Sequence, residues 1–423
     1  MKKNYNFFLS FTAGFGKMLM ICLALSFILT GITCFSQTAY VTNQGDSSVS
    51  VINVSTNAVF ATIPVGSQPY GVSVSADGNK VYVVNQNNSS VSVINTATNT
   101  VSATVSVGGA PRGICVTPDG SKVYVANRNG NSVSVISTAT NTISATISVG
   151  SGPWGVTISP DGSKVYVTNI DVNTVTVINS SNNIVSTTIP VGLSPRGESV
   201  SPDGTKLYVT NEGANTVSVI NTATNTVSST ITVGANPYGV VLSPDGTKVY
   251  VVNEGANTVS VINTTTNAIT ATVSVGLHPY GISVSPDGSK IYVTNSGVTT
   301  VSVINTSSNT VSATVTVGAA PYAFGNFISS HPAGIASLNN ELTSIDIYPN
   351  PASGIFTISY HLSKINSMFQ IVDITGRSVY TKDINGIDGK ETIDVSGLNN
   401  GIYYWELIND DYKRNNGKLV IMK

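Results

Sequence analysis

The sequence is poor in charge, histidine and cysteine, and each shortage narrows what the protein can do. Charged residues make up 10% of the 423 positions, with 20 basic against 21 acidic side chains. Such sparse and balanced charge lacks the basic footprint of a nucleic-acid binder, so we expect no nucleic-acid partner. With three histidines, a histidine-rich metal centre is not expected, and we assign no metal and no other cofactor.

The first 36 residues have the pattern of a secretory signal peptide. A basic start precedes an apolar run at 18–32, and the small residues Cys34 and Ser36 place cleavage before Gln37. A transmembrane anchor and a lipoprotein signal are the alternatives, but the apolar run is shorter than the ~20 residues that span a bilayer. After cleavage only Cys115 remains, so we expect neither an internal disulfide nor a membrane span in the mature protein.

The chain then repeats itself every 42 residues. Each unit contains Tyr-Val-x-Asn, an alternating apolar run, Val-Gly, Pro-x-Gly and a turn of the Ser-Pro-Asp-Gly type. The runs are rich in Val, Ile, Tyr and Thr, which predicts four short strands in each unit and no helix. The repeated Asn is expected to cap a turn through its side chain. The seven motifs begin at Tyr40, Tyr82, Tyr124, Tyr166, Tyr208, Tyr250 and Tyr292.

Counting the motifs predicts a closed ring of seven blades. A single four-stranded sheet cannot bury both of its faces, and radial stacking of such sheets solves this. Tyr-Val-x-Asn occurs seven times, and so does the Pro-x-Gly position, whose last copy is Pro321-Tyr322-Ala323, whereas the Ser-Pro-Asp-Gly-like turn occurs six times. The chain should therefore enter at the second strand of a blade, and residues 321–328 should complete the blade begun by residues 38–66. An open solenoid, which needs no such offset, is the alternative.

With these motifs, the segment resembles the YVTN-type β-propeller repeats of bacterial and archaeal surface proteins. The resemblance covers residues 38–328, and we assign residues 37–328 to a seven-bladed propeller. It implies an extracellular propeller and does not imply one particular activity.

Charges that differ between the copies are predicted to share one face. They lie either between the second and third strands of a blade or at the start of the first strand, and both places open on the same side of an up-and-down blade. The turns on the other side repeat Asp and Lys in every complete copy. The charges that differ are Asp46, Arg112, Arg128, Asp171, Arg196, Glu198, Glu212 and Glu254.

We interpret this face as a candidate binding surface, because aromatic and arginine side chains suit protein interfaces and sugar platforms. The alternative is that these side chains only cover the apolar top of the ring. The candidate ligand-binding residues are Tyr70, Arg112, Trp154, Arg196, Glu198, Tyr238, His278, Tyr280 and Tyr322.

Glu198 stands out because the other copies carry Val, Ile or Phe at its position. A carboxylate at an apolar strand position is costly unless it is paired. Arg196 lies two residues away, on the same side of a regular strand, so a local ion pair is expected. A ligand contact at the channel mouth is the alternative.

After a predicted linker at 329–344, residues 345–423 abandon the repeat, and their alternating apolar runs predict a small β-sandwich. This segment resembles the type A C-terminal sorting domain of type IX secretion. The resemblance implies that the type IX machinery is a partner, with export to the surface of a Bacteroidetes-type cell and attachment or release there. A generic adhesive sandwich is the alternative. Its motif residues are Tyr348, Pro349, Asn350, Pro351, Gly376, Arg377, Gly401, Tyr403 and Lys423.

The leading hypothesis is a secreted or surface-attached binding, adhesion or structural module, whose ligand is a glycan, a peptide or another surface protein. An enzyme such as a lactonase-like hydrolase or a lyase is the alternative, with a self-assembling surface-layer component as a third. No Ser-His-Asp order, HExxH or Cys-His spacing is present, so we assign no catalytic residue. The groups available to an enzyme are His278, Glu198, Glu212, Glu254 and Arg196.

Overall fold

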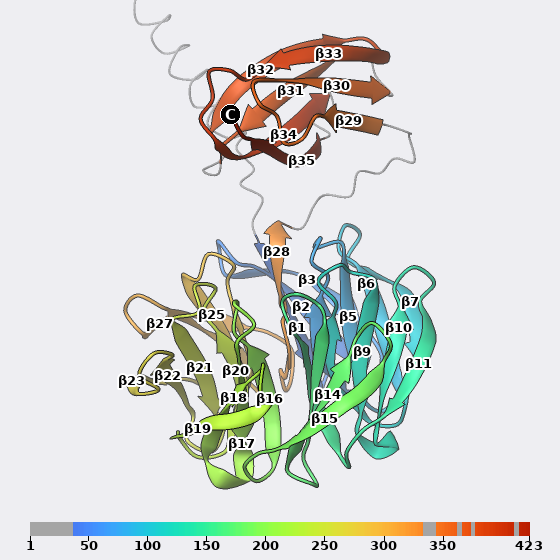
Figure 1. Cartoon of the computed structure of the whole chain (residues 1–423). Coiled ribbons are helices and arrows are strands. Elements are labelled where there is room, and N and C mark those ends of the chain that lie inside the picture. The colour runs from blue at the N-terminus through green and yellow to red at the C-terminus, as the bar shows by residue number, and fades with distance from the viewer. Residues whose placement is uncertain (1–36, 333–343, 362–365, 374–376, 410–413) are drawn as a thin grey trace, which may run out of the picture. The chain divides into compact units, whose positions relative to one another are not determined.

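The computed structural model describes residues 37–332, 344–361, 366–373, 377–409 and 414–423. The predicted signal peptide, most of the predicted linker and Gly376 lie outside these residues. The described chain divides into two compact units, which are treated separately below (Figure 1). Within the described ranges, no helix has the length and apolarity needed to cross a membrane.

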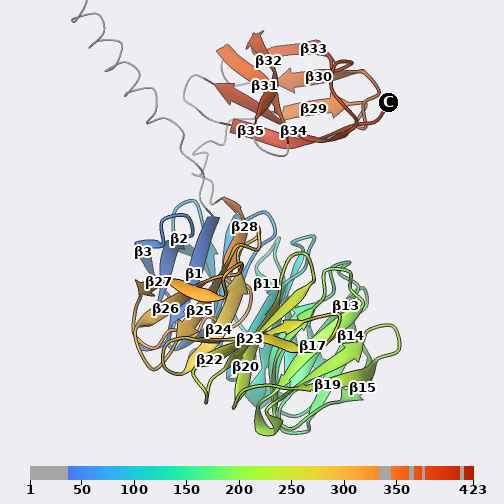
Figure 2. The same ribbon diagram turned by 90° about the vertical axis from the view of Figure 1, so that its left-hand side faces the viewer.

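Residues 37–332 form seven four-stranded antiparallel sheets, seen from two sides in Figures 1 and 2. From the innermost strand outward, blade 1 is β28 (Ile328–Pro332), β1 (Gln37–Asn43), β2 (Ser48–Asn53) and β3 (Ala58–Pro64). Blade 2 is β4 (Pro69–Val74), β5 (Lys80–Asn85), β6 (Ser90–Asn95) and β7 (Thr100–Ser106). Blade 3 is β8 (Pro111–Val116), β9 (Lys122–Asn127), β10 (Ser132–Ser137) and β11 (Thr142–Ser148).

The remaining blades repeat this order. Blade 4 is β12 (Pro153–Ile158), β13 (Lys164–Asn169), β14 (Thr174–Asn179) and β15 (Ile184–Pro190). Blade 5 is β16 (Pro195–Val200), β17 (Lys206–Asn211), β18 (Thr216–Asn221) and β19 (Thr226–Thr232). Blade 6 is β20 (Pro237–Leu242), β21 (Lys248–Asn253), β22 (Thr258–Asn263) and β23 (Ile269–Ser274). Blade 7 is β24 (Pro279–Val284), β25 (Lys290–Asn295), β26 (Thr300–Asn305) and β27 (Thr310–Thr316). Short 3₁₀ turns at Arg128–Gly130 and Glu212–Ala214 follow β9 and β17.

The seven-bladed, four-stranded propeller confirms the predicted fold. The Tyr residues of all seven Tyr-Val-x-Asn motifs are at most 1% exposed and fill the spaces between blades with Val and Ile. The glycine of Pro-x-Gly lies where the innermost strands of neighbouring blades meet. A Cβ atom at Gly113 would lie 2.6 Å from the Trp154 carbonyl oxygen, so any side chain there would push two blades apart.

The turn lysines, predicted only as a repeated feature, join the blades to one another. Lys164 Nζ donates to the Thr222 carbonyl of the next blade at 2.7 Å, and the lysines of blades 2, 3, 5 and 6 make the same bond. In blade 7, Lys290 Nζ donates to the Val54 carbonyl of blade 1 at 2.8 Å. The series therefore runs around a closed ring, which excludes the open solenoid.

The closing strand differs from the prediction. Pro321 faces Asn43, as the equivalent prolines do in other blades, but residues 323–326 then leave the ladder, and β28 resumes pairing with Ile328 opposite Ala39. The predicted pairing of residues 321–328 is therefore only partly correct, and β28 extends four residues into the predicted linker. Ala323 replaces the repeat glycine and has a φ of 41°, so the chain turns inward, where Phe324 pairs with Gly71 of blade 2.

The C-terminal unit is a two-sheet sandwich, as predicted. One sheet contains β29 (Ser344–Tyr348), β30 (Ile355–His361) and β33 (Asp388–Asp394). The other contains β32 (Ser378–Asn385), β31 (Asn366–Val372), β34 (Gly401–Asn409) and β35 (Arg414–Ile421). Phe356 and Ile393 of the first sheet share a buried core with Phe369, Leu407 and other residues of the second.

The predicted sorting motifs hold the last strand of this unit in place. Asn350 Oδ1 accepts the Val420 amide at 2.9 Å, and Gly401 pairs with Ile421. Lys423 Nζ donates to the carbonyls of Ser396 and Leu398, both at 2.5 Å. Tyr348, the cis-linked Pro349 and Pro351, Arg377 and Tyr403 lie at or near strand ends and turns of this unit.

Candidate functional site

One side chain from each blade meets at the ring axis. They occupy the middle position of Pro-x-Gly, at the start of each innermost strand. The face where these strands begin is called the upper face below, and the face of the Ser-Pro-Asp-Gly turns the turn face. In order around the ring, the residues are Tyr70, Arg112, Trp154, Arg196, Tyr238, Tyr280 and Tyr322. They are called the mouth ring.

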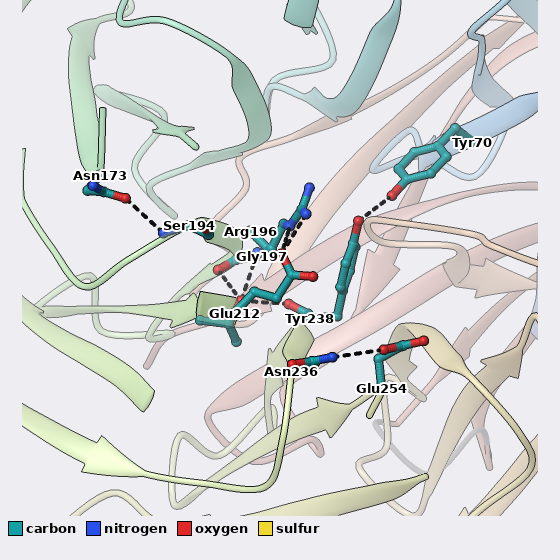
Figure 3. A network of polar contacts seen from close by, with 10 residues as sticks. Tyr70, Asn173, Ser194, Arg196, Gly197, Glu212, Asn236, Tyr238 and Glu254 are labelled. Carbon is teal, nitrogen blue, oxygen red and sulfur yellow. Dashed lines mark hydrogen bonds and ion pairs between the residues drawn. The ribbon is translucent and has the colours of Figure 1, made fainter. Parts of the chain in front are cut away.

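The aromatic members of the mouth ring pack against one another and against Phe324. The Tyr238 and Tyr280 ring centroids are 4.2 Å apart, and the Tyr70 and Trp154 rings meet edge to face at 5.9 Å. The hydroxyls of Tyr70 and Tyr238 hydrogen-bond at 3.1 Å (Figure 3). Burial raises the pKa of Tyr70 to about 12, so this phenol stays neutral.

Arginines fill the gaps between the aromatic rings. Arg196 lies 4.0 Å from the Trp154 ring centroid and 5.0 Å from that of Tyr238. Arg112 lies 4.5 Å from Trp154 and 4.8 Å from Tyr70, and Arg128 from the neighbouring loop lies 5.2 Å from Trp154. Guanidinium groups over aromatic faces are attracted by the ring quadrupole, and the attraction grows as water is excluded.

The mouth ring thus closes the upper end of the channel. Tyr70, Trp154 and Tyr238 are at most 5% exposed, whereas Arg112, Arg196, Tyr280 and Tyr322 remain partly exposed. The alternative raised from the sequence, that these side chains only cover the apolar top of the ring, therefore holds for the three buried rings. A ligand on this face would meet the arginines and the two outer tyrosines first.

The arginines of the mouth ring are only partly paired. Arg196 pairs with Glu212, whose Oε2 lies 2.5 Å from Nη2 (Figure 3), and Arg112 Nη1 donates to Gln86 Oε1 at 2.6 Å. Arg112 Nε and Arg196 Nη1 are buried without a hydrogen-bond partner. Burial, together with the nearby arginines, lowers the pKa of Arg112. The guanidinium groups of Arg112, Arg128 and Arg196 thus gather around Trp154, and the carboxylate of Glu212 is paired with one of them.

His278 lies on the same face but outside the mouth ring. Its side chain is 61% exposed, and its Nδ1 is 2.5 Å from Glu254 Oε1. Glu254 Oε2 in turn accepts a long 3.4 Å hydrogen bond from Asn236 (Figure 3). The pair has the composition of a general acid–base couple and is open to solvent.

The predicted ion pair between Arg196 and Glu198 is wrong. Arg196 forms its ion pair with Glu212 instead, and both oxygens of Glu198 are buried without a hydrogen-bond partner. The ladder between β16 and β17 is irregular between Pro195 and Glu198, so residues two apart no longer share a side of the strand. Burial raises the pKa of Glu198 well above its ordinary value, and a contact with the Thr168 hydroxyl opposes this only in part.

Beneath the mouth ring lies an axial pocket of about 400 Å³, formed by the innermost strands. Phe324 belongs both to the aromatic cluster and to the pocket wall, so it separates the two. Pro244 and Pro286 of the Ser-Pro-Asp-Gly turns line the opposite end, which places the opening on the turn face. This cavity was not predicted from the sequence. Its one charged lining residue, Glu198, was noted there only because the other copies carry apolar residues at its position.

Two further repeat residues have roles that sequence analysis did not assign correctly. The Asn of Tyr-Val-x-Asn was expected to cap a turn, but Asn85 Nδ2 instead bridges the hydroxyls of Ser90 and Ser92 on the next strand. Where the third position of Tyr-Val-x-Asn is Thr, its side chain links neighbouring blades. Thr168 Oγ1 accepts a hydrogen bond from the Gly155 amide and donates one to the Arg196 carbonyl, both at 2.8 Å. Across the ranges that the structure describes, no three His, Cys, Asp or Glu residues converge as a metal site.

Comparison with known families gives two matches. The model of the Virginiamycin B lyase family matches residues 56–331, and that of the Secretion system C-terminal sorting domain matches residues 346–422. These agree with the propeller and the sorting domain expected from the repeats and motifs. No curated protein matches the sequence.

Two solved structures are similar to the propeller. One is the hydrazine synthase of Kuenenia stuttgartiensis, at 25% identity and a TM-score of 0.56, covering 60% of this chain and 88% of that one. The other is a functionally unknown protein from Desulfotomaculum acetoxidans DSM 771, at 18% identity and a TM-score of 0.60, covering 69% of this chain and 100% of that one. The second likeness shows the fold alone.

Proposed function

Since the chain belongs to the virginiamycin B lyase family of propellers and ends in a secretion sorting domain, we propose that it is an exported binding module that works through the mouth ring. Its location is the outside of a Bacteroidetes-type cell, either attached to surface lipopolysaccharide or released. The propeller carries the binding function, and the sorting domain engages the type IX secretion machinery.

One observation supports the mouth ring as the contact surface. Seven nearly identical blades differ mainly at this face, where Arg112 and Arg196 stack on aromatic rings and keep N–H groups without partners. Arginine and aromatic side chains dominate the binding energy of protein interfaces, and charge complementarity selects the partner. The ligand is a glycan, a peptide or a surface protein, and the guanidinium groups that gather at Trp154 favour one with acidic groups.

The test uses two variants with opposite expected effects. Arg112→Gln removes one positive charge and should weaken binding to acidic members of a glycan and peptide array, whereas Glu212→Gln removes the negative charge and should strengthen it. Arg112→Lys keeps the charge but loses the planar stacking, so its binding should lie between that of the wild type and that of Arg112→Gln. Equal binding by all four proteins would exclude this surface.

The export half of the proposal is tested separately. Residues 344–423 fused to a periplasmic reporter should carry the reporter to the cell surface in a strain with type IX secretion. Retention in the periplasm of that strain, with the fusion intact, would contradict the role of the sorting domain.

A lyase activity is the second candidate, favoured by the family match and by the His278–Glu254 pair. The name of the family suggests virginiamycin B as the substrate to test. Turnover that is lost in His278→Ala but kept in Asp171→Asn, a variant on the same face, would establish catalysis. If the wild-type protein shows no turnover, the lyase candidate is wrong and binding is the function of this face.

A further inference from the structure

The axial pocket is lined almost entirely by groups without charge. Val156, Val240 and Ile282 supply apolar walls, and Ser73, Ser199 and Ser283 supply hydroxyls. Its volume of about 400 Å³ is within the range of sites for small molecules. Among the described residues that line it, Glu198 is the one charged group, and Cys115 is the one other group that can titrate. Burial, with Glu198 nearby, raises the pKa of Cys115, which stays a neutral thiol.

Among the residues that the structure describes, no cationic side chain pairs with Glu198. The nearest arginine in sequence, Arg196, is held by Glu212 at the mouth ring, and the Thr168 hydroxyl gives its proton to the Arg196 carbonyl. Both carboxylate oxygens lie buried beside Gly155, where a Cβ atom would overlap Oε2. Burying a carboxylate without a partner is unfavourable, and the equivalent positions in blades 2 to 4, 6 and 7 carry Val or Ile. A group that costs stability and occurs in one blade of an otherwise uniform ring is better explained by a ligand than by packing.

We infer that the axial pocket binds a small organic cation, an ammonium group on a short apolar body, with Glu198 as its counter-ion. The walls match the apolar body, and the serine hydroxyls can accept N–H bonds that the carboxylate does not. A hard metal ion does not fit, because Ca²⁺ takes six to eight oxygen ligands and the pocket offers a single carboxylate. The ligand enters from the turn face, so this site is separate from the contact surface proposed for the upper face.

Binding involves a defined proton movement. In the empty pocket, Glu198 lies against Gly155, and burial raises its pKa, which favours the protonated carboxyl group. A neutral amine takes that proton and becomes the ammonium partner of the carboxylate, whereas an ammonium ion binds as Glu198 releases its proton to solvent. In either case the side chain turns about its own torsions toward the pocket, and the pair forms in a water-poor site, where the attraction between opposite charges is strong.

The experiment titrates the purified protein by calorimetry at pH 8 with primary alkylamines from methylamine to hexylamine. The corresponding alcohols and carboxylic acids serve as matched probes. We expect the amines to bind with an optimum chain length, and the alcohols and acids to bind at least tenfold more weakly.

Variants decide the role of Glu198. Glu198→Gln keeps the shape and should lower amine affinity at least tenfold, and Glu198→Val, which restores the residue of blades 2, 4 and 6, should do the same. Asp171→Asn removes a carboxylate from the upper face, outside the mouth ring and the pocket lining, and should leave amine affinity unchanged. Circular dichroism confirms that each variant is folded. Equal amine binding by the wild type and Glu198→Gln, equal binding of amines and alcohols, or no amine binding at all would overturn the assignment. None of these outcomes bears on the array experiment with the mouth ring.

Discussion

Lys290 Nζ donates a 2.8 Å hydrogen bond to the carbonyl of Val54, which joins blade 7 to blade 1 across 236 positions of the chain. Beside it, the Tyr292 hydroxyl donates to the same carbonyl at 3.0 Å and to Asn57 Oδ1 at 2.7 Å. The five earlier lysine bonds link blades that are consecutive in the chain. The seam between blades 7 and 1 therefore has the same lysine bond as the five junctions from blade 2 to blade 7, although its residues come from opposite ends of the repeat.

Lys290→Met should weaken the seam more than Lys164→Met weakens an internal junction. Each variant loses one charge-assisted hydrogen bond, worth about 1.5–3 kcal/mol when buried and less here because the lysines are partly exposed. At the seam, the loss also promotes local opening, because the chain passes from blade 7 into β28 alone, and β28 is joined to β1 by strand pairing rather than by a loop. Hydrogen exchange of β2 and β3 should increase in Lys290→Met, and exchange in blade 5 should stay unchanged in Lys164→Met. Equal protection of β2 and β3 in both variants would show that the bond does not hold the ring closed.

Gly239→Ala should destabilise the propeller by about 1–3 kcal/mol or more, the usual cost of overpacking. A Cβ atom at this position would lie 2.5 Å from the Tyr280 carbonyl oxygen of the next blade, and the backbone there cannot move without separating two innermost strands. Gly109→Ala is the control, because its nearest neighbour, Asn129 Cβ, lies at an ordinary contact distance of 3.5 Å. Urea unfolding measures both. A similar midpoint for the two variants would argue against tight approach at the axis.

Phe324→Ala should lower stability by about 3–5 kcal/mol, the usual cost of removing a buried Phe side chain. Phe324 is 6% exposed, and its ring centroid lies 6.1 Å from those of Tyr70 and Tyr238, between the mouth ring and the axial pocket. Phe60→Ala, at an outer position that is 54% exposed, should cost far less. Thermal melts of the two variants test this, and a Phe324→Ala melt like that of Phe60→Ala would mean that Phe324 does not close the channel.

Glu198→Gln should become more stable relative to the wild type as the pH rises. The folded protein holds the Glu198 proton more tightly than the unfolded chain does, because burial raises the folded-state pKa. The resulting stabilisation is fully present below the unfolded value of about 4.3 and is lost as the pH rises toward the raised pKa. The difference in melting temperature between Glu198→Gln and the wild type should therefore grow between pH 4 and pH 8.

Thr157→Val is the control for this pH series. It changes the same pocket without adding or removing a titratable group, so its difference from the wild type should stay constant with pH. A constant difference for Glu198→Gln as well would mean that the carboxylate is not desolvated.

The repeat made most of the propeller predictable, because a 42-residue period with four alternating runs admits few architectures. The closing strand was less predictable. Its register depends on Ala323, which replaces a glycine, and on Phe324, which is drawn into the aromatic cluster rather than into the ladder. A side chain that packs across the ring axis leaves no periodic signal in the sequence.

The candidate site was predictable only in part. The sequence assigned Tyr70, Trp154 and Arg196 to one face, and the structure brings them together in the mouth ring. The sequence could not show that arginines stack on aromatic rings there, because each of these side chains comes from a different blade and they meet only when the ring is assembled. The Arg196–Glu198 pairing failed because an irregular ladder at Pro-x-Gly breaks the alternation on which it relied.

Blade 1 draws its innermost strand from residues 328–332 and its other strands from residues 37–64. A ribosome that starts at the N-terminus therefore releases an incomplete first blade, which stays incomplete until almost the whole propeller has been made. The sorting domain is translated directly afterwards. A polypeptide that ends before β28 lacks both the strand that completes blade 1 and the sorting domain. Such an incomplete propeller is therefore not delivered to the secretion machinery.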